Sequence, residues 1–233
     1  TGSDLHLQLA EEETPLTQPT LSPSLGQFSA RGFPTPHWRW LEARRCLLLP
    51  GADIGSSLSP VDVTLDPGTA NPFLVLAADR RGVRRGDVWA SLPDTPERFT
   101  TEPCVLGCPG FTMGQHHWEV AVADGGDWWA TGVAGGSIRR KGVLQLSPEE
   151  GIWAVGQWFG QYHAFTHPDW TPLHLHRPPR SIRVCLDCTG GQVAFADGED
   201  RVPIFTFSLR PGPGEALHPW LYIGSDSWLA LCP

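Results

Sequence analysis

The chain has 233 residues, which is long enough for one large all-β domain with an extension or for two small domains. Its formal charge of −8 and its isoelectric point near 5.5 argue against general nucleic-acid binding and against attraction to anionic membranes. The 26 Gly and 23 Pro residues favour many short strands joined by turns over long helices. No apolar run approaches the roughly 18 residues of a membrane span, so we expect no direct membrane insertion.

The N-terminal part of the chain contains two unlike segments. Residues 1–30 are predicted to be a flexible tail or linker, because their second half is rich in Pro, Ser and Thr. Residues 31–59 are predicted to be a helical extension, in which Trp38, Leu41 and Arg45 share one side of the helix. We expect this helix to pack on the domain that follows, and a dimer contact through it is the alternative.

The clearest strand in the sequence begins at Gln115, because Trp118 and Val120 alternate onto one face. A glycine-containing turn at 124–127 follows, and a return strand is predicted to begin at Trp128. The tryptophans that we expect in the core are Trp118, Trp129 and Trp153.

Five sequence motifs, which follow one another along the chain, resemble those of a known family. In chain order they are Val-Thr-Leu-Asp-Pro-x-Thr-Ala-Asn-Pro from residue 63, Leu-Pro-Asp-x-Pro-Glu-Arg-Phe from residue 92, Cys-Val-Leu-Gly-Cys-x-Gly-Phe from residue 104, Trp-Glu-Val from residue 118 and Leu-Ser-Pro-Glu-Glu-Gly-Ile-Trp from residue 146. Residues 60–233 thus resemble a PRY–SPRY domain of the tripartite-motif or butyrophilin type. The resemblance implies an all-β fold, a bent antiparallel two-sheet β-sandwich of the concanavalin-like jelly-roll kind. Its PRY part would span residues 60–112 and its SPRY part residues 113–233.

The resemblance implies a non-catalytic module that captures a protein or peptide partner on a loop-lined aromatic pocket. We expect Trp158, Phe159, Tyr162 and Trp170 to line this pocket, because exposed aromatic side chains dominate many protein-recognition sites. The candidate partner-binding residues are Asp79, Arg80, Arg81, Ala130, Lys141, Trp158, Phe159, Gln161, Tyr162, His163, Asp169, Trp170, Ser225 and Asp226.

Two narrower activities found in the family are not implied. In immunoglobulin-binding relatives, an aromatic and an acidic residue of the binding motif fall on Gly156 and Ala130 here. In phosphoantigen-sensing butyrophilins, His and Arg residues surround a pyrophosphate. Glu102 and Asp169 stand at two of those positions here, and only Lys141 matches. Two carboxylates would repel a diphosphate.

The parent protein is interpreted as a tripartite-motif ubiquitin ligase of innate immunity, with this domain as its cytoplasmic substrate-recognition part. One alternative is the cytosolic ligand-sensing domain of a butyrophilin-like receptor that binds a small anion, for which the Arg80–Arg85 turn supplies basic residues. A second alternative is a structural or dimerising domain.

We expect no catalytic residue, metal or cofactor. The sequence has no Gly-x-Ser-x-Gly, His-Glu-x-x-His or Gly-Lys-Ser motif. Strand alternation places one of His116 and His117 inside and the other outside, so the two cannot easily share a metal. The cysteine pairs 104/108 and 185/188 superficially suggest a four-thiolate zinc site. They lie in apolar, strand-like segments, however, so we expect buried free thiols in a reducing compartment.

Overall fold

The structure, a computed structural model, describes residues 59–122 and 126–233. These residues form fifteen β-strands and one short 3-10 helix, η2 (Pro148–Glu150), and they contain no α-helix. The strands form two sheets, which confirms the predicted all-β two-sheet fold. The predicted tail and helical extension lie outside the described residues, except for Ser59. Within the described part, no helix has the length and apolar character needed to cross a membrane.

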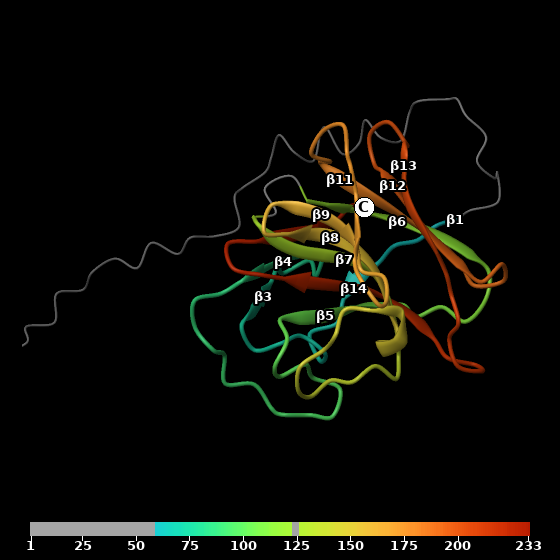
Figure 1. The fold of residues 1–233 in the computed structure, drawn as a ribbon. Helices are drawn as coiled ribbons and strands as arrows, with labels where there is room; N and C mark the ends of the chain where they lie inside the picture. Colours follow the sequence, from blue (N-terminus) through green and yellow to red (C-terminus); the bar gives the residue numbers. More distant parts are fainter. Residues whose placement is uncertain (1–58, 123–125) are drawn as a thin grey trace, which may run out of the picture. The chain divides into compact units, whose positions relative to one another are not determined.

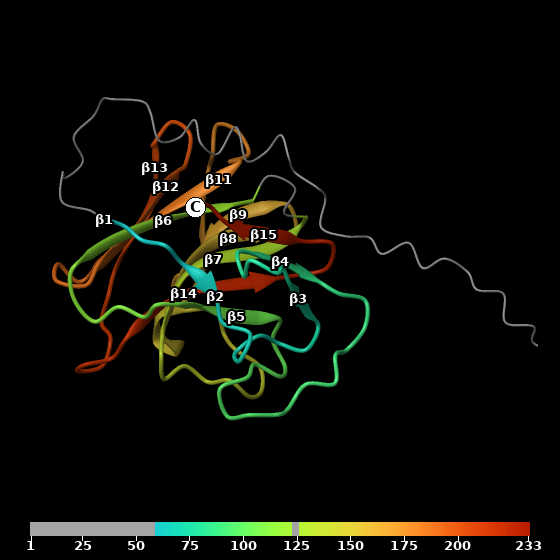
Figure 2. The same ribbon diagram turned by 180° about the vertical axis from the view of Figure 1, so that it is seen from behind.

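The first sheet has eight strands and is antiparallel except for the pairing of β1 with β6. Across the sheet, its strands are β13 (Pro203–Ser208), β12 (Gln192–Asp197), β11 (Ser181–Asp187), β6 (Gln115–Ala121), β15 (Trp228–Leu231), β4 (Gly82–Arg85) and β3 (Leu74–Leu76), with β1 (Ser59–Pro60) beside β6. β11 pairs along all of β6, while β1 and β15 share the other edge of β6. Figure 2 shows β15, β4 and β3 side by side.

The second sheet has seven strands. In order they are β10 (Thr171–Pro172), β9 (Gln161–Ala164), β8 (Ile152–Trp158), β7 (Trp128–Gly135), β14 (Leu217–Ile223), β5 (Cys104–Cys108) and β2 (Thr64–Leu65). In Figure 1 the strands β7, β8 and β9 lie next to one another, as their pairing requires. The return strand predicted from Trp128 is therefore confirmed as β7.

The main core lies between the two sheets. Trp118 and Val120 of β6 face Trp129 and Trp153 of the other sheet within one cluster of buried apolar side chains. The three tryptophans predicted to be in the core are each at most 4% exposed. Alternation along β6 thus assigned its buried face correctly, because successive strand residues point to opposite sides of a sheet.

A second core covers the other face of the seven-stranded sheet. Its strand residues, such as Ala130 and Trp220, pack with Phe99, Leu146 and Phe165, which come from outside the strands. The seven-stranded sheet is therefore buried on both faces, and its strands read as nearly continuous apolar runs. The burial of these apolar side chains fixes the connecting segments against the sheet.

Three local expectations need correction. From its sequence, the segment 137–143 is predicted to be a basic turn followed by a strand, but it forms no strand, and its Ile138 packs in the second core instead. Gly82–Arg85, predicted as part of a turn-rich connection, is strand β4 because it pairs with β3 and β15. Cys108, expected to be buried, is exposed at the end of β5, whereas Cys104 is fully buried.

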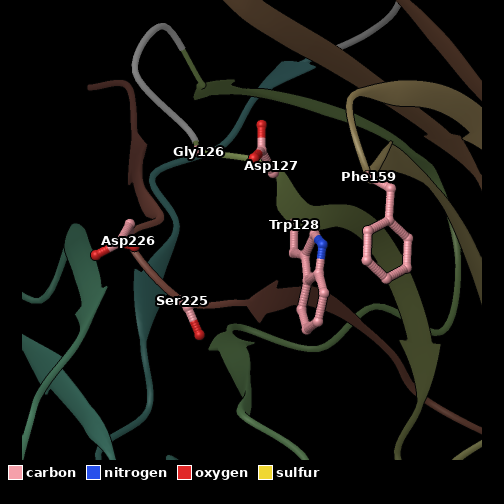
Figure 3. A pocket seen from close by; sticks show the side chains of 6 residues that line it. All are labelled: Gly126, Asp127, Trp128, Phe159, Ser225 and Asp226. Atoms are coloured by element: carbon pink, nitrogen blue, oxygen red, sulfur yellow. The ribbon is translucent and has the colours of Figure 1, made fainter.

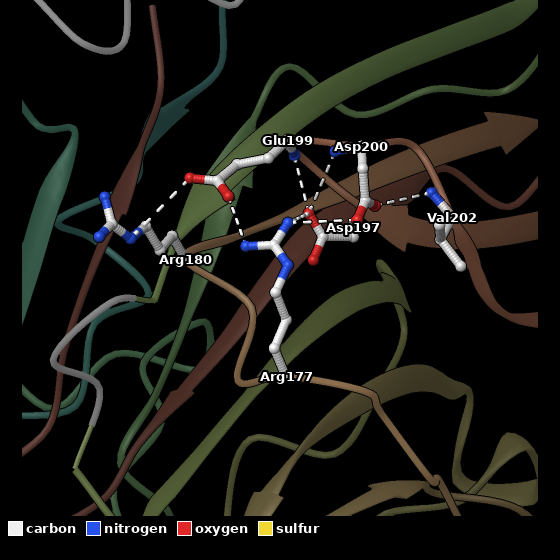
Figure 4. A network of polar contacts seen from close by, with 6 residues as sticks. All are labelled: Arg177, Arg180, Asp197, Glu199, Asp200 and Val202. Atoms are coloured by element: carbon white, nitrogen blue, oxygen red, sulfur yellow. Dashed lines mark hydrogen bonds and ion pairs between the residues drawn. The ribbon is translucent and has the colours of Figure 1, made fainter.

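An ion-pair network ties the connection before β11 to the β12–β13 turn (Figure 4). The Arg177 guanidinium lies 3.3 Å from the carboxylates of both Asp197 and Asp200, and 2.5 Å from that of Glu199. The Asp197 carboxylate also accepts a hydrogen bond from the Glu199 backbone N–H at 2.8 Å. Each exposed pair contributes little free energy, but together they fix the path of two neighbouring turns.

Candidate functional site

The β8–β9 hairpin ends in a two-residue turn, Phe159-Gly160. Both residues have positive φ, 50° and 76°, which is the pattern of a type I′ turn. Positive φ is rare for a bulky residue and costs about 1 kcal/mol or more. The turn holds Phe159 at the tip of the hairpin, where the residue is 70% exposed.

Trp128, Trp158, Phe159 and Trp170 form what we call the aromatic cluster. Trp128 and Trp158 stack across the β7–β8 pair, with ring centroids 5.6 Å apart and an interplanar angle of 8°. The Phe159 ring meets Trp128 edge-on at 4.8 Å, and Trp170 meets Trp158 edge-on at 5.5 Å. The ring centroid of Trp158 also lies 5.3 Å from that of buried Tyr222, so the aromatic cluster packs against the second core.

A pocket of about 380 Å³ opens beside Trp128 and Phe159. In Figure 3 the two rings stand on one side of the pocket, and Ser225 and Asp226 stand on the other. The lining residues are Gly126, Asp127, Trp128, Phe159, Ser225 and Asp226, which come from three chain segments.

Hydrogen bonds hold the β14–β15 turn against the start of β7. The Trp128 carbonyl accepts hydrogen bonds from the Ser227 hydroxyl at 2.7 Å and from the Gly224 backbone N–H at 2.9 Å. Asp226 has a φ of 57°, a conformation that Asp and Asn adopt more readily than most residues. The two sides of the pocket are thus joined by two hydrogen bonds to the Trp128 carbonyl, one from a side chain and one from the backbone.

The structure brings several predicted residues to this region. Phe159, Ser225 and Asp226 line the pocket, and Trp158 and Trp170 support it from the aromatic cluster.

Three predicted polar residues lie beside the cluster. Gln161 is exposed and pairs with Trp158 in the hairpin, and the His163 ring lies 5.8 Å from that of Trp170. Asp169 is exposed immediately before Trp170. All three are accessible to a partner that contacts the cluster.

Three other predicted residues are not brought to the pocket. Tyr162 points to the opposite face of the sheet from Trp158, where its ring lies 6.3 Å from that of Trp129. Ala130 is fully buried in the second core, so a partner cannot touch it. Lys141 forms an ion pair with Asp94.

The predicted residues Asp79, Arg80 and Arg81 form the turn between β3 and β4. Arg80 is exposed, whereas the Arg81 guanidinium pairs with Asp62. Arg85, at the end of β4, lies over an aromatic ring at 5.0 Å from its centroid. Arg81 and Arg85 are thus both engaged within the domain, whereas Arg80 lies exposed at the turn.

Sequence reasoning missed Asp127 and Trp128. The signal was available in the doublet Trp128-Trp129, because alternation in a strand that begins there buries one ring and leaves the other on the opposite face. Gly126 and Asp127 belong to the turn before this strand, so they could be placed only once the strand start was known.

The histidines and cysteines form no metal centre among the described residues, in which no group of three or more His, Cys, Asp or Glu could hold an ion. His116 stacks on Phe111 at 4.2 Å. Burial, together with repulsion from Arg183 and Arg201, lowers the pKa of His117 to about 4. Burial raises the pKa of the Cys104 thiol well above its usual value, which makes this cysteine a poor nucleophile.

Comparisons with known proteins identify the family. The SPRY-associated domain (PRY) matches residues 63–111, and the SPRY domain matches residues 115–229. Bovine butyrophilin subfamily 1 member A1 is 43% identical over 180 residues, and human zinc finger protein RFP is 42% identical over 183 residues; each match covers 76% of this chain. The chain spans about a third of these relatives, 34% and 35% of their lengths.

Solved structures support the same fold. The TRIM65 PSpry domain superposes with a TM-score of 0.64 at 20% identity, covering 78% of this chain and all of that one. The stonustoxin structure superposes with a TM-score of 0.63 at 23% identity, covering 74% of this chain and 27% of that one. With two family models matched in order along one sandwich, the chain belongs to the PRY–SPRY family of the tripartite-motif and butyrophilin type, whose domains are generally non-catalytic protein-interaction modules.

Proposed function

We propose that this domain captures a protein or peptide partner on the pocket beside the aromatic cluster. The observation that carries the proposal is the position of Phe159, which is 70% exposed at the tip of a two-residue turn and lies edge-on to Trp128 at the pocket wall. Large apolar side chains held out in solvent are common at protein-recognition sites.

The rigidity of the surroundings supports this use of the pocket. Trp128 and Trp158 lie in paired strands, and the β14–β15 turn is hydrogen-bonded to the Trp128 carbonyl. Binding loops on a rigid scaffold lose little conformational entropy when a partner docks. Pre-ordered aromatic rings therefore favour recognition more than mobile ones would.

In the full-length protein, this domain would be the cytoplasmic substrate-recognition part of a tripartite-motif ubiquitin ligase. The alternative parent is a butyrophilin-like receptor with the domain on its cytoplasmic side. Identities of 42% to a zinc finger protein and 43% to a butyrophilin favour neither parent over the other.

Phe159→Ala tests the proposal, with Val143→Ala as its matched control. The two side chains are similarly exposed, 70% and 71%, but Val143 lies in the segment between β7 and η2. Phe159 suits the test better than Trp158, because truncation of Trp158 would also remove packing in the second core.

The immobilised 233-residue chain and both variants are each incubated with cell lysate, after thermal unfolding has shown that all three fold. We expect proteins retained by the wild type and by Val143→Ala to be lost by Phe159→Ala. Identical captures by all three chains would contradict the proposal and exclude this pocket as the recognition site.

A further inference from the structure

The pocket combines two carboxylates with two aromatic rings. Asp127 and Asp226 line it from different turns, and neither side chain has a hydrogen-bond or ion-pair partner among the described residues. Some other exposed acidic residues are engaged within the domain: Asp62 pairs with Arg81, and Glu199 pairs with Arg177. The pocket therefore has two negative charges that no cationic side chain among the described residues neutralises.

The aromatic wall favours the same sign of ligand charge. The faces of Trp and Phe rings carry partial negative charge, and they attract an ammonium or guanidinium group placed within about 6 Å of the ring centre. Trp128 and Phe159 both border the pocket. A cation there would interact with ring faces and carboxylates together, whereas an anion would be repelled by both.

We infer that the pocket takes a cationic side chain, a lysine or an arginine, from the partner protein. This inference rests on the proposed function and adds the chemistry of the partner residue to it. The long alkyl stem of either residue would pack on Phe159, and its charged head would lie near Asp127 and Asp226. The net charge of −8 adds a long-range attraction for basic partners.

Affinity selection of a library of random linear peptides tests the inference. Peptides are selected on the intact 233-residue chain, and each is then measured against Phe159→Ala. Peptides that need Phe159 define ligands of the pocket, and we expect Lys or Arg to be enriched at one position among them. If no selected peptide depends on Phe159, the proposed function itself fails. If the dependent peptides show no basic enrichment, only the present inference fails.

Charge-neutral variants then test which groups recognise the cation. Asp127→Asn and Asp226→Asn keep the side-chain shape, and Asn tolerates the positive φ of Asp226. Glu97→Gln removes the same charge from an exposed residue in the segment between β4 and β5, so it serves as the control. Each pocket variant is expected to weaken peptide binding about two- to fivefold, the range for an exposed ion pair.

A double-mutant cycle gives the sharpest result. The basic residue of a selected peptide is replaced by neutral citrulline or norleucine, and both peptides are measured against the wild type and each variant. The replacement should weaken binding to the wild type and to Glu97→Gln but should have a smaller effect on Asp127→Asn or Asp226→Asn. Equal effects on all four chains would overturn the assignment of these carboxylates.

Discussion

The unfolding free energy should depend on pH through His117, whose pKa is lowered to about 4 in the folded protein. The largest cause is burial on β6, and the second is repulsion from Arg183 and Arg201, which both pair with Glu119. Since the unfolded chain has a histidine pKa near 6.5, it binds more protons than the folded chain between pH 6.5 and about 4. Stability must therefore fall as the pH drops through this range and then level off.

The difference between the folded and unfolded pKa values of His117 limits the loss of unfolding free energy on acidification to about 3 kcal/mol. Because His117 is only half-buried, solvent screening reduces the expected loss to about 1–2 kcal/mol. His117→Gln removes the titration while keeping a polar side chain of similar length. His174→Gln is the control, because it removes an exposed histidine from the segment after β10.

Urea unfolding followed by tryptophan fluorescence measures the effect between pH 7.5 and pH 4.5, the wild type and both variants being compared so that the common titration of carboxylates cancels. We expect His117→Gln to lose about 1–2 kcal/mol less than the wild type on acidification, and His174→Gln to follow the wild type. Parallel curves for all three chains, or an NMR titration that gives His117 a pKa near 6.5, would refute this reasoning.

Three other outcomes follow from packing and exposure. In Gly156→Ala, the new Cβ would lie 2.1 Å from a backbone oxygen of β7, so urea unfolding should show a loss of about 2–3 kcal/mol. Gly212→Ala, whose Cβ has no neighbour nearer than 3.6 Å, should change stability by less than about 0.5 kcal/mol. Iodoacetamide should label exposed Cys108 in the native protein and buried Cys104 only after unfolding, as read by peptide mass spectrometry. Arg177→Ala should speed hydrogen exchange in the β12–β13 turn, and unchanged exchange there would show that its ion pairs do not order the turn.

The sheet that carries the strongest sequence pattern was predicted most completely. Trp118 and Val120 alternate with polar neighbours on β6, whose other face does not join the main core, so period-two reasoning assigns both faces. The segment 137–146 was harder, because Ile138, Leu144 and Leu146 pack in the second core from an irregular segment rather than from a strand. Burial without periodicity cannot be assigned to a strand or a loop from sequence alone.

The candidate site could be predicted only in part, and the hairpin shows why. Trp158 and Tyr162 were both expected in one pocket, but a two-residue turn pairs Trp158 with Gln161 and Tyr162 with Gln157. Paired residues share a face, so this turn length sends the two rings to opposite sides of the sheet. A turn longer by one residue would have changed the pairing. The prediction therefore depended on turn length, which the sequence Phe-Gly leaves open.

The same turn explains why Phe159 is exposed while Trp158 is not. A type I′ turn takes its two central residues out of the sheet's alternation. Phe159 therefore extends past the edge of the second core, which covers part of Trp158, and instead meets Trp128 from the side. Glycine would adopt this positive φ with less strain than phenylalanine. A bulky residue at such a position costs stability and contributes little packing to either core, which is consistent with the proposed recognition of a partner at the adjoining pocket.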